Sequence, residues 1–187
     1  MESFFVSMFV VAAGEIGDKT QLLALVLAAR FRRPVPILCG ILAATIVNHA
    51  LAGALGALVR AALDPQLLRA LLAVSFFAIA LWALKPDTMD TAPRAPGRFG
   101  LFAFTAAVFF LAEIGDKTQL ATMALAAKYP SLGAVVAGTT LGMLLADAPA
   151  VLLAQRITAR ISLRLMRAVA AALFALLGAA AAFGIVW

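Results

Sequence analysis

The sequence predicts an all-α polytopic membrane protein, with six transmembrane helices arranged as two inverted-topology three-helix repeats. The chain of 187 residues is 65% hydrophobic and has a mean hydropathy of +1.05, which is typical of an integral membrane protein rather than a soluble domain. Apolar stretches long enough to cross a bilayer follow one another along it. An octapeptide, EIGDKTQL, occurs at Glu15–Leu22 and again at Glu113–Leu120.

Each predicted span is a mostly apolar stretch close to the roughly 20 residues that a transmembrane helix needs. The six spans are residues 4–29, 35–59, 67–84, 99–127, 132–154 and 165–186. Little of the chain lies outside them, so there is no room for a soluble catalytic domain. Any function must therefore be built within the membrane.

A linker rich in proline divides the chain into two halves. Residues 85–98 read KPDTMDTAPRAPGR, and prolines at this density prevent a helix from continuing. The predicted organisation is a first repeat at 1–84, a cytoplasmic linker at 85–98 and a second repeat at 99–187. The two octapeptides lie 98 residues apart, and Gly40 and Gly138 correspond at the same offset.

The distribution of Lys and Arg predicts the orientation in the membrane, because positive residues gather on the cytoplasmic side. Ten Lys and Arg residues follow the first, third and fifth spans, and three Lys and Arg residues lie near the span ends on the opposite side. The ten are Arg30, Arg32, Arg33, Lys85, Arg94, Arg98, Arg156, Arg160, Arg164 and Arg167, against Arg60, Arg69 and Lys128. Both termini are therefore expected in the periplasm. Three spans per repeat also require the second repeat to enter the membrane from the other side, as in secondary transporters with a midplane site.

The octapeptide places charged groups where they are costly. A charge at the centre of a spanning helix costs about 3 kcal/mol on insertion scales, and intramembrane acids are usually functional. Glu15 and Asp18 are three residues apart, as are Glu113 and Asp116, so each pair is expected on one helix face. The glycine between them permits close helix approach or local unwinding.

These residue types predict a binding site for a hard cation. The four carboxylates are the expected ligands, and the side chains of Thr20, Gln21, Thr118 and Gln119 add neutral oxygens. Ca²⁺ and Mn²⁺ suit oxygen ligands, whereas Mg²⁺ gives up its water reluctantly. Lys19 and Lys117 are each expected to pair with a carboxylate of their own octapeptide. The formal charge over both octapeptides is −2, which one divalent ion or two protons would balance.

Three further residues could belong to an ion or proton pathway. Asn48 and His49 fall near the middle of the second span, and Asp147 falls near the middle of the fifth. His49 corresponds to Asp147 in the repeat, and an imidazole ligand would favour Mn²⁺ over Ca²⁺.

The sequence also allows interpretations other than transport. The octapeptides could be polar clamps between helices, but two identical copies at midplane depth favour a binding site. No HExxH sequence is present and His49 is the only histidine, so an intramembrane metalloenzyme is not expected. Nucleic-acid binding is also not expected, because the positive residues lie in short connections between spans. A cation channel or uniporter stays open as an alternative, as does a structural or regulatory subunit.

With its two E-x-G-D-[KR]-[ST] motifs in a six-span chain, the sequence resembles the cation/proton exchanger family of calcium/manganese transporters and bacterial MneA-type manganese exporters. The resemblance implies export of Mn²⁺, and possibly Ca²⁺, from the cytoplasm in exchange for protons, in a bacterial inner membrane. It implies the four motif acids as the ion ligands. The metal is then cargo, and no prosthetic group is expected; a homodimer is compatible with the sequence. Asp147 departs from the asparagine that we would expect more often in the family.

Overall fold

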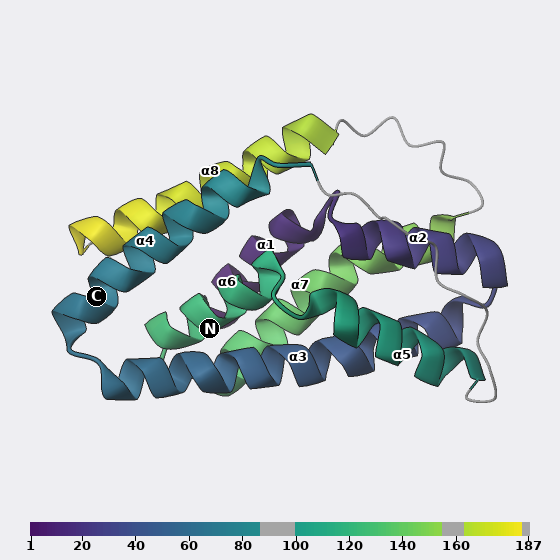
Figure 1. Cartoon of the computed structure of the whole chain (residues 1–187), viewed down its shortest axis with the longest axis horizontal. Helices are drawn as coiled ribbons and strands as arrows, with labels where there is room; N and C mark the ends of the chain where they lie inside the picture. Colours follow the sequence, from purple (N-terminus) through teal and green to yellow (C-terminus); the bar gives the residue numbers. More distant parts are fainter. Residues whose placement is uncertain (87–99, 155–162, 185–187) are drawn as a thin grey trace.

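The computed structural model describes residues 1–86, 100–154 and 163–184. These residues form eight α-helices (Figure 1). Their bounds are α1 Glu2–Glu15, α2 Lys19–Phe31, α3 Pro34–Ala62, α4 Pro65–Ala83, α5 Gly100–Glu113, α6 Lys117–Lys128, α7 Leu132–Leu153 and α8 Leu163–Phe183. The predicted linker at 85–98 lies largely outside the described residues.

Within the described parts of the chain, three helices are long and apolar enough to cross a membrane, namely α3, α4 and α7. α5 and the segment Arg167–Phe183 are shorter apolar helices. The prediction of six continuous spans needs a correction. The first predicted span is divided into α1 and α2, and the fourth into α5 and α6. Both divisions fall inside the octapeptide. The all-helical fold class is confirmed.

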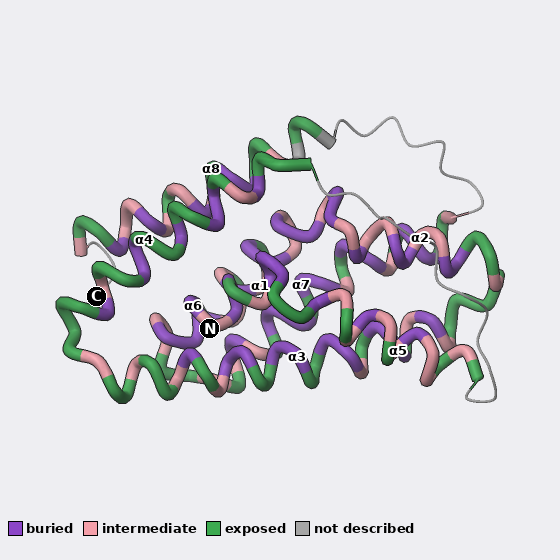
Figure 2. Tube along the Cα trace, in the orientation of Figure 1, coloured by how far each residue is buried: buried purple, intermediate pink, exposed green. Residues whose placement is uncertain are grey.

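The distribution of side chains is the reverse of that in a soluble protein. Large apolar side chains such as Phe9, Leu81 and Leu176 are exposed, whereas the octapeptide acids are fully or almost fully buried. Figure 2 shows exposed residues along the outer sides of α3, α4 and α8. This arrangement suits a bilayer, where the surrounding hydrocarbon accepts apolar side chains and polar groups must be satisfied internally.

Helices of each half pack against the long helix of the other half. Gly138 of α7 lies against Phe4 and Ser7 of α1, where an added Cβ would come within 2.3 Å of the Phe4 carbonyl oxygen. Gly40 of α3 lies in the same way against Phe102 and Thr105 of α5, with a closest approach of 2.7 Å. The residues of the two contacts correspond in the repeat. Gly40 and Gly138, Phe4 and Phe102, and Ser7 and Thr105 are each 98 residues apart in the sequence. Glycine is needed at both because the backbones approach so closely.

The two octapeptides come together in the middle of the molecule. The start of α1, the α3–α4 turn, the α6–α7 turn and the end of α8 lie at one end of the molecule, and α5 begins at the other (Figure 1). α1 and α5 therefore approach the centre from opposite ends. Two apolar clusters lie beside the octapeptides, one built largely from α4, α6 and α8 and the other from α2, α3 and α5.

Candidate cation-binding site

Each octapeptide interrupts its helix at the same place. Glu15 ends α1, Gly17 turns the chain with a φ of 83°, and Asp18 begins α2 as its N-cap. The second octapeptide repeats this geometry, with Gly115 at a φ of 74° between Glu113 and Asp116. The expected shared helix face is therefore wrong. The local unwinding that glycine permits is what the structure shows, because glycine adopts positive φ without strain and aspartate caps the next helix.

The two glutamines stabilise these breaks. The Gly17 N–H donates to the side-chain oxygen of Gln21 and the Gly115 N–H to that of Gln119, both at 2.8 Å. Their amide nitrogens reach the long helix of the other half: Gln21 donates to the Ala146 carbonyl at 3.0 Å, and Gln119 to the Asn48 side chain at 3.5 Å. In this conformation the glutamine oxygens accept backbone hydrogen bonds, so they hold the backbone at the breaks rather than face the carboxylates as free ligands.

Three carboxylates from both halves converge between the breaks. One carboxylate oxygen from each of Glu15, Glu113 and Asp116 lies within 4.8 Å of the other two. Both glutamates are completely buried and Asp116 is 1% exposed. Among the described residues, no hydrogen-bond partner reaches Glu15 Oε2 or Glu113 Oε1. Buried charged oxygens without partners are costly, which is typical of a site built for a cation or a proton.

Two threonines orient these carboxylates. The Thr20 hydroxyl lies within hydrogen-bond distance of Glu15 Oε1 as donor. The Thr118 hydroxyl contacts Glu113 Oε2 at 3.2 Å and Asp116 Oδ2 at 3.1 Å. Each threonine thus holds one oxygen of its own glutamate. The other glutamate oxygen is left available.

The lysines pair across the two halves. Lys19 Nζ lies 3.1 Å from Asp116 Oδ1, and Lys117 Nζ lies 2.9 Å from Asp18 Oδ1. We expected pairing with carboxylates of the same octapeptide, whereas these two ion pairs join the octapeptides of the two halves, because each break turns the lysine towards the facing octapeptide. The two pairs differ in exposure: the Lys19 side chain is 30% exposed and that of Lys117 is 3% exposed.

The pathway candidates lie on the two long helices. Asn48 on α3 donates to the Phe110 carbonyl at 3.2 Å. His49 on α3 and Asp147 on α7 are fully buried, and neither has a hydrogen-bond partner among the described residues. The buried hydroxyls of Ser7, Thr45 and Thr140, which the sequence did not predict as pathway residues, also have no hydrogen-bond partner among the described residues. In the sequence, each of these residues shows only a hydroxyl group within an apolar stretch. Such a hydroxyl often donates to a backbone carbonyl of its own helix, so it does not by itself predict a pathway.

Comparison with known proteins identifies the family of the chain. The family described as "Divalent cation/proton antiporter GDT1" matches residues 3–91 and 101–185. A Vibrio cholerae protein named "Putative manganese exporter" is 48% identical over 98% of this chain and 92% of its own length. "GDT1-like protein 5" of Arabidopsis thaliana is 28% identical over 95% of this chain and 94% of its own. "GDT1-like protein sll0615" of Synechocystis is 28% identical over 93% of each chain. No solved structure matches the chain.

Proposed function

Because the chain belongs to the GDT1 family of divalent cation/proton antiporters, we propose that it exports Mn²⁺ from the cytoplasm in exchange for protons, with Ca²⁺ as a second candidate cargo. The family is one of transporters, not enzymes. The name of the Vibrio cholerae relative supports Mn²⁺. The observation that carries the proposal is the buried group of Glu15, Glu113 and Asp116, which joins carboxylates of both halves.

The charge of the buried groups supports proton exchange. Lys19 and Lys117 balance the two aspartates, so the remaining formal charge of −2 belongs to Glu15 and Glu113. Two close carboxylates cannot both stay charged in a low-dielectric interior without a cation. One divalent ion or two protons would balance them, and competition for the same oxygens would couple the two fluxes. Asp147 is the candidate for an additional proton.

The proposed ligands are Glu15, Glu113 and Asp116, with Asp18 as the fourth acid. Carboxylate oxygens suit Mn²⁺ and Ca²⁺. For Asp116 to bind the ion, Lys19 has to leave it, and the partial exposure of the Lys19 side chain supports such a movement. An alternating-access transporter needs one side of its site sealed while the other is reachable. The unequal exposure of the two ion pairs agrees with this requirement.

The proposed architecture is an inverted repeat in a bacterial inner membrane. The opposite directions of α1 and α5 and the reciprocal glycine contacts at Gly40 and Gly138 support it. We place both termini in the periplasm and the linker in the cytoplasm. This orientation puts Arg30, Arg32 and Arg33 on the cytoplasmic side, as the positive-inside rule requires.

Transport by purified protein in vesicles tests the proposal. Vesicles with an acidic interior in a neutral buffer should accumulate Mn²⁺ while their internal pH rises. Glu15→Gln and Glu113→Gln should each reduce this uptake to the background of empty vesicles, because each removes a charged ligand from the site. Glu2→Gln is the matched control, since Glu2 is an exposed acid at the start of α1.

The outcomes separate the site from the mechanism. Normal uptake by both glutamine variants would contradict the assignment of the site. Mn²⁺ uptake that proceeds equally without a pH gradient, and without any change of internal pH, would contradict antiport and favour the channel or uniporter.

A further inference from the structure

His49 of α3 is a fully buried histidine whose ring takes part in no hydrogen bond among the described residues. A neutral imidazole carries one donor and one acceptor, and burying such groups unpaired is costly. A buried polar group of this kind calls for an explanation, and in an apolar span a functional one is the first to consider.

The preceding residue, Asn48, shows what a packing role looks like at this place. Its side-chain nitrogen donates to the Phe110 carbonyl at 3.2 Å, and its oxygen accepts from Gln119 at 3.5 Å. Asn48 therefore connects α3 to α5 and α6, the two helices that meet at the second break. His49 makes none of these bonds, so the connection between the helices does not account for its polar ring.

The other half of the chain has the same arrangement. Ala146 of α7 corresponds to Asn48 in the repeat, and its carbonyl accepts a hydrogen bond from Gln21. The next residue, Asp147, is fully buried, and neither of its carboxylate oxygens has a partner within the described parts of the chain. In both halves, the residue directly after the contact with the octapeptide glutamine thus carries a buried group of a type that binds metals.

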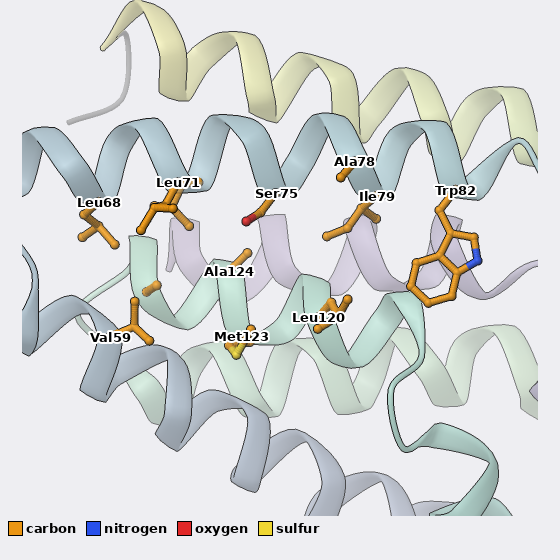
Figure 3. A pocket seen from close by; sticks show the side chains of 12 residues that line it. Val59, Leu68, Leu71, Ser75, Ala78, Ile79, Trp82, Leu120, Met123 and Ala124 are labelled. Atoms are coloured by element: carbon orange, nitrogen blue, oxygen red, sulfur yellow. The ribbon is translucent and has the colours of Figure 1, made fainter.

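The face of α3 that carries His49 is turned towards α6. Gly56 lies seven residues later, close to two helical turns, and therefore on nearly the same face. A Cβ at Gly56 would meet the Met123 carbonyl of α6. Val59 of α3 and Met123 of α6 also line one apolar groove (Figure 3). Asp116, the residue directly before α6, is close enough for its charge to act on His49.

We propose that His49 is a ligand of the transported ion and makes the site prefer Mn²⁺ to Ca²⁺. This inference rests on the proposed function, with the carboxylates of Glu15, Glu113 and Asp116 as the ligands that both ions share. Ca²⁺ is bound by oxygen ligands, whereas sites for divalent transition metals accept the imidazole nitrogen. A site made of carboxylates alone would take either ion. One imidazole in the ligand set therefore favours Mn²⁺.

The ion-bound arrangement differs from the present one by side-chain movements. The group of oxygens within 4.8 Å is contributed by Glu15, Glu113 and Asp116, and His49 is not a member of it. Asp116 lies 3.1 Å from Lys19 and has to leave this lysine before it can bind an ion. On release, Asp116 can turn towards His49, which its charge already reaches. The ion is then held between the carboxylates and the imidazole.

Electron paramagnetic resonance of bound Mn²⁺ tests this ligand directly. His49 is the only histidine of the chain, so in protein without a histidine tag an imidazole nitrogen at the metal can come from no other residue. The full chain in detergent with substoichiometric Mn²⁺ should show the nitrogen modulation of an imidazole ligand in its electron spin echo. His49→Gln should lose this modulation while still binding Mn²⁺ through the carboxylates.

Competition between Mn²⁺ and Ca²⁺ for the same protein measures the selectivity. His49→Gln should reduce the preference for Mn²⁺ at least about ten-fold, the lower end of the cost of losing a group that supports a metal site. The change should come from weaker Mn²⁺ binding, with Ca²⁺ binding little altered.

Thr45→Val is the matched control. Thr45 lies one turn before His49 on α3, is equally buried, and has a hydroxyl without a partner among the described residues. This variant should keep both the nitrogen modulation and the preference for Mn²⁺.

Bound Mn²⁺ without nitrogen modulation in the wild-type protein would overturn the proposal and leave the carboxylate site intact. An equal change of preference in His49→Gln and Thr45→Val would also overturn it, because a general effect on packing would then explain the result. Failure of the proposed function has a different outcome. The protein then binds no Mn²⁺, or binds it equally well after Glu15→Gln and Glu113→Gln, and either result overturns both proposals.

Discussion

At the scale of single residues, the crossed lysines determine which of the buried acids keep an unbalanced charge. Lys19 neutralises Asp116 and Lys117 neutralises Asp18, so the charge left over lies on the two glutamates. The two ion pairs are chemically alike but differ in environment, since the Lys117 side chain is only 3% exposed and that of Lys19 is 30% exposed. Removing one partner of a buried pair leaves an uncompensated charge, which costs more than the loss of an exposed pair.

Lys117→Met should therefore destabilise the protein by about 3–5 kcal/mol, because it leaves the charge of Asp18 buried without its lysine. Lys19→Met should cost clearly less, because the Lys19 side chain is 30% exposed in its ion pair, so the pair that is lost is less buried than that of Lys117. Thermal unfolding of both variants in detergent, followed by tryptophan fluorescence, measures the difference. Equal destabilisation would contradict the unequal burial of the two pairs.

At the scale of helices, the breaks at Gly17 and Gly115 change what each octapeptide does. A continuous helix would place glutamate and aspartate on one face, whereas the break puts the glutamate at a helix C-terminus and the aspartate at a helix N-terminus. Backbone N–H groups at a helix start favour a negative charge. The short α1, α2, α5 and α6 thus carry the acids, and the long α3 and α7 support them from the facing half.

Gly40 of α3 and Gly138 of α7, which pack against helices of the other half, allow the packing between the halves to be tested. Gly138→Ala should destabilise the protein by about 1–3 kcal/mol, because the new Cβ would meet the Phe4 backbone and helices would have to separate. Gly40→Ala should act in the same direction against Phe102 and Thr105.

Gly133→Ala is the matched control for these two variants. It lies in the same helix as Gly138, with nothing within 4 Å of the added Cβ. Thermal midpoints in detergent give the comparison. If all three glycines tolerated alanine equally, close backbone approach would not explain Gly40 and Gly138.

Much of the fold could be predicted from the sequence, and the missed parts have physical reasons. Hydropathy locates the apolar segments, but it does not register a break of three residues inside a long apolar stretch. The pattern Gly17-Asp18 does contain a signal, because glycine ends helices and aspartate begins them. The lysine pairing carried no such signal. Lys117 and Asp18 meet only because the two breaks face each other, which depends on the packing of both halves.

At the scale of the whole molecule, the direction of transport depends on the orientation in the membrane. The α2–α3 turn contains Arg32 and the α6–α7 turn contains Ser131, both exposed and at opposite ends of the molecule. The proposed orientation puts Arg32 in the cytoplasm and Ser131 in the periplasm, because the former belongs to the more positive side.

Cysteine labelling in intact cells checks this orientation. In a Cys39→Ala background, which removes the native thiol, Ser131→Cys should react with a membrane-impermeant maleimide. Arg32→Cys should react only after the inner membrane is permeabilised. The opposite labelling pattern would reverse the proposed orientation and, with it, the assignment of export.

The crossed ion pairs also have a consequence for synthesis of the chain. Asp18 leaves the ribosome 99 residues before its partner Lys117, a delay of roughly 5–20 s at ordinary rates of elongation. During that time α1 and α2 enter the bilayer with Glu15, Asp18 and Lys19 unmatched by the second half. The first half therefore depends on the insertion machinery, or on water beside it, until α6 and α7 arrive. The proposed cation site is completed late in biogenesis, so a chain truncated after the first half would present three unmatched charges to the quality-control proteases of the membrane.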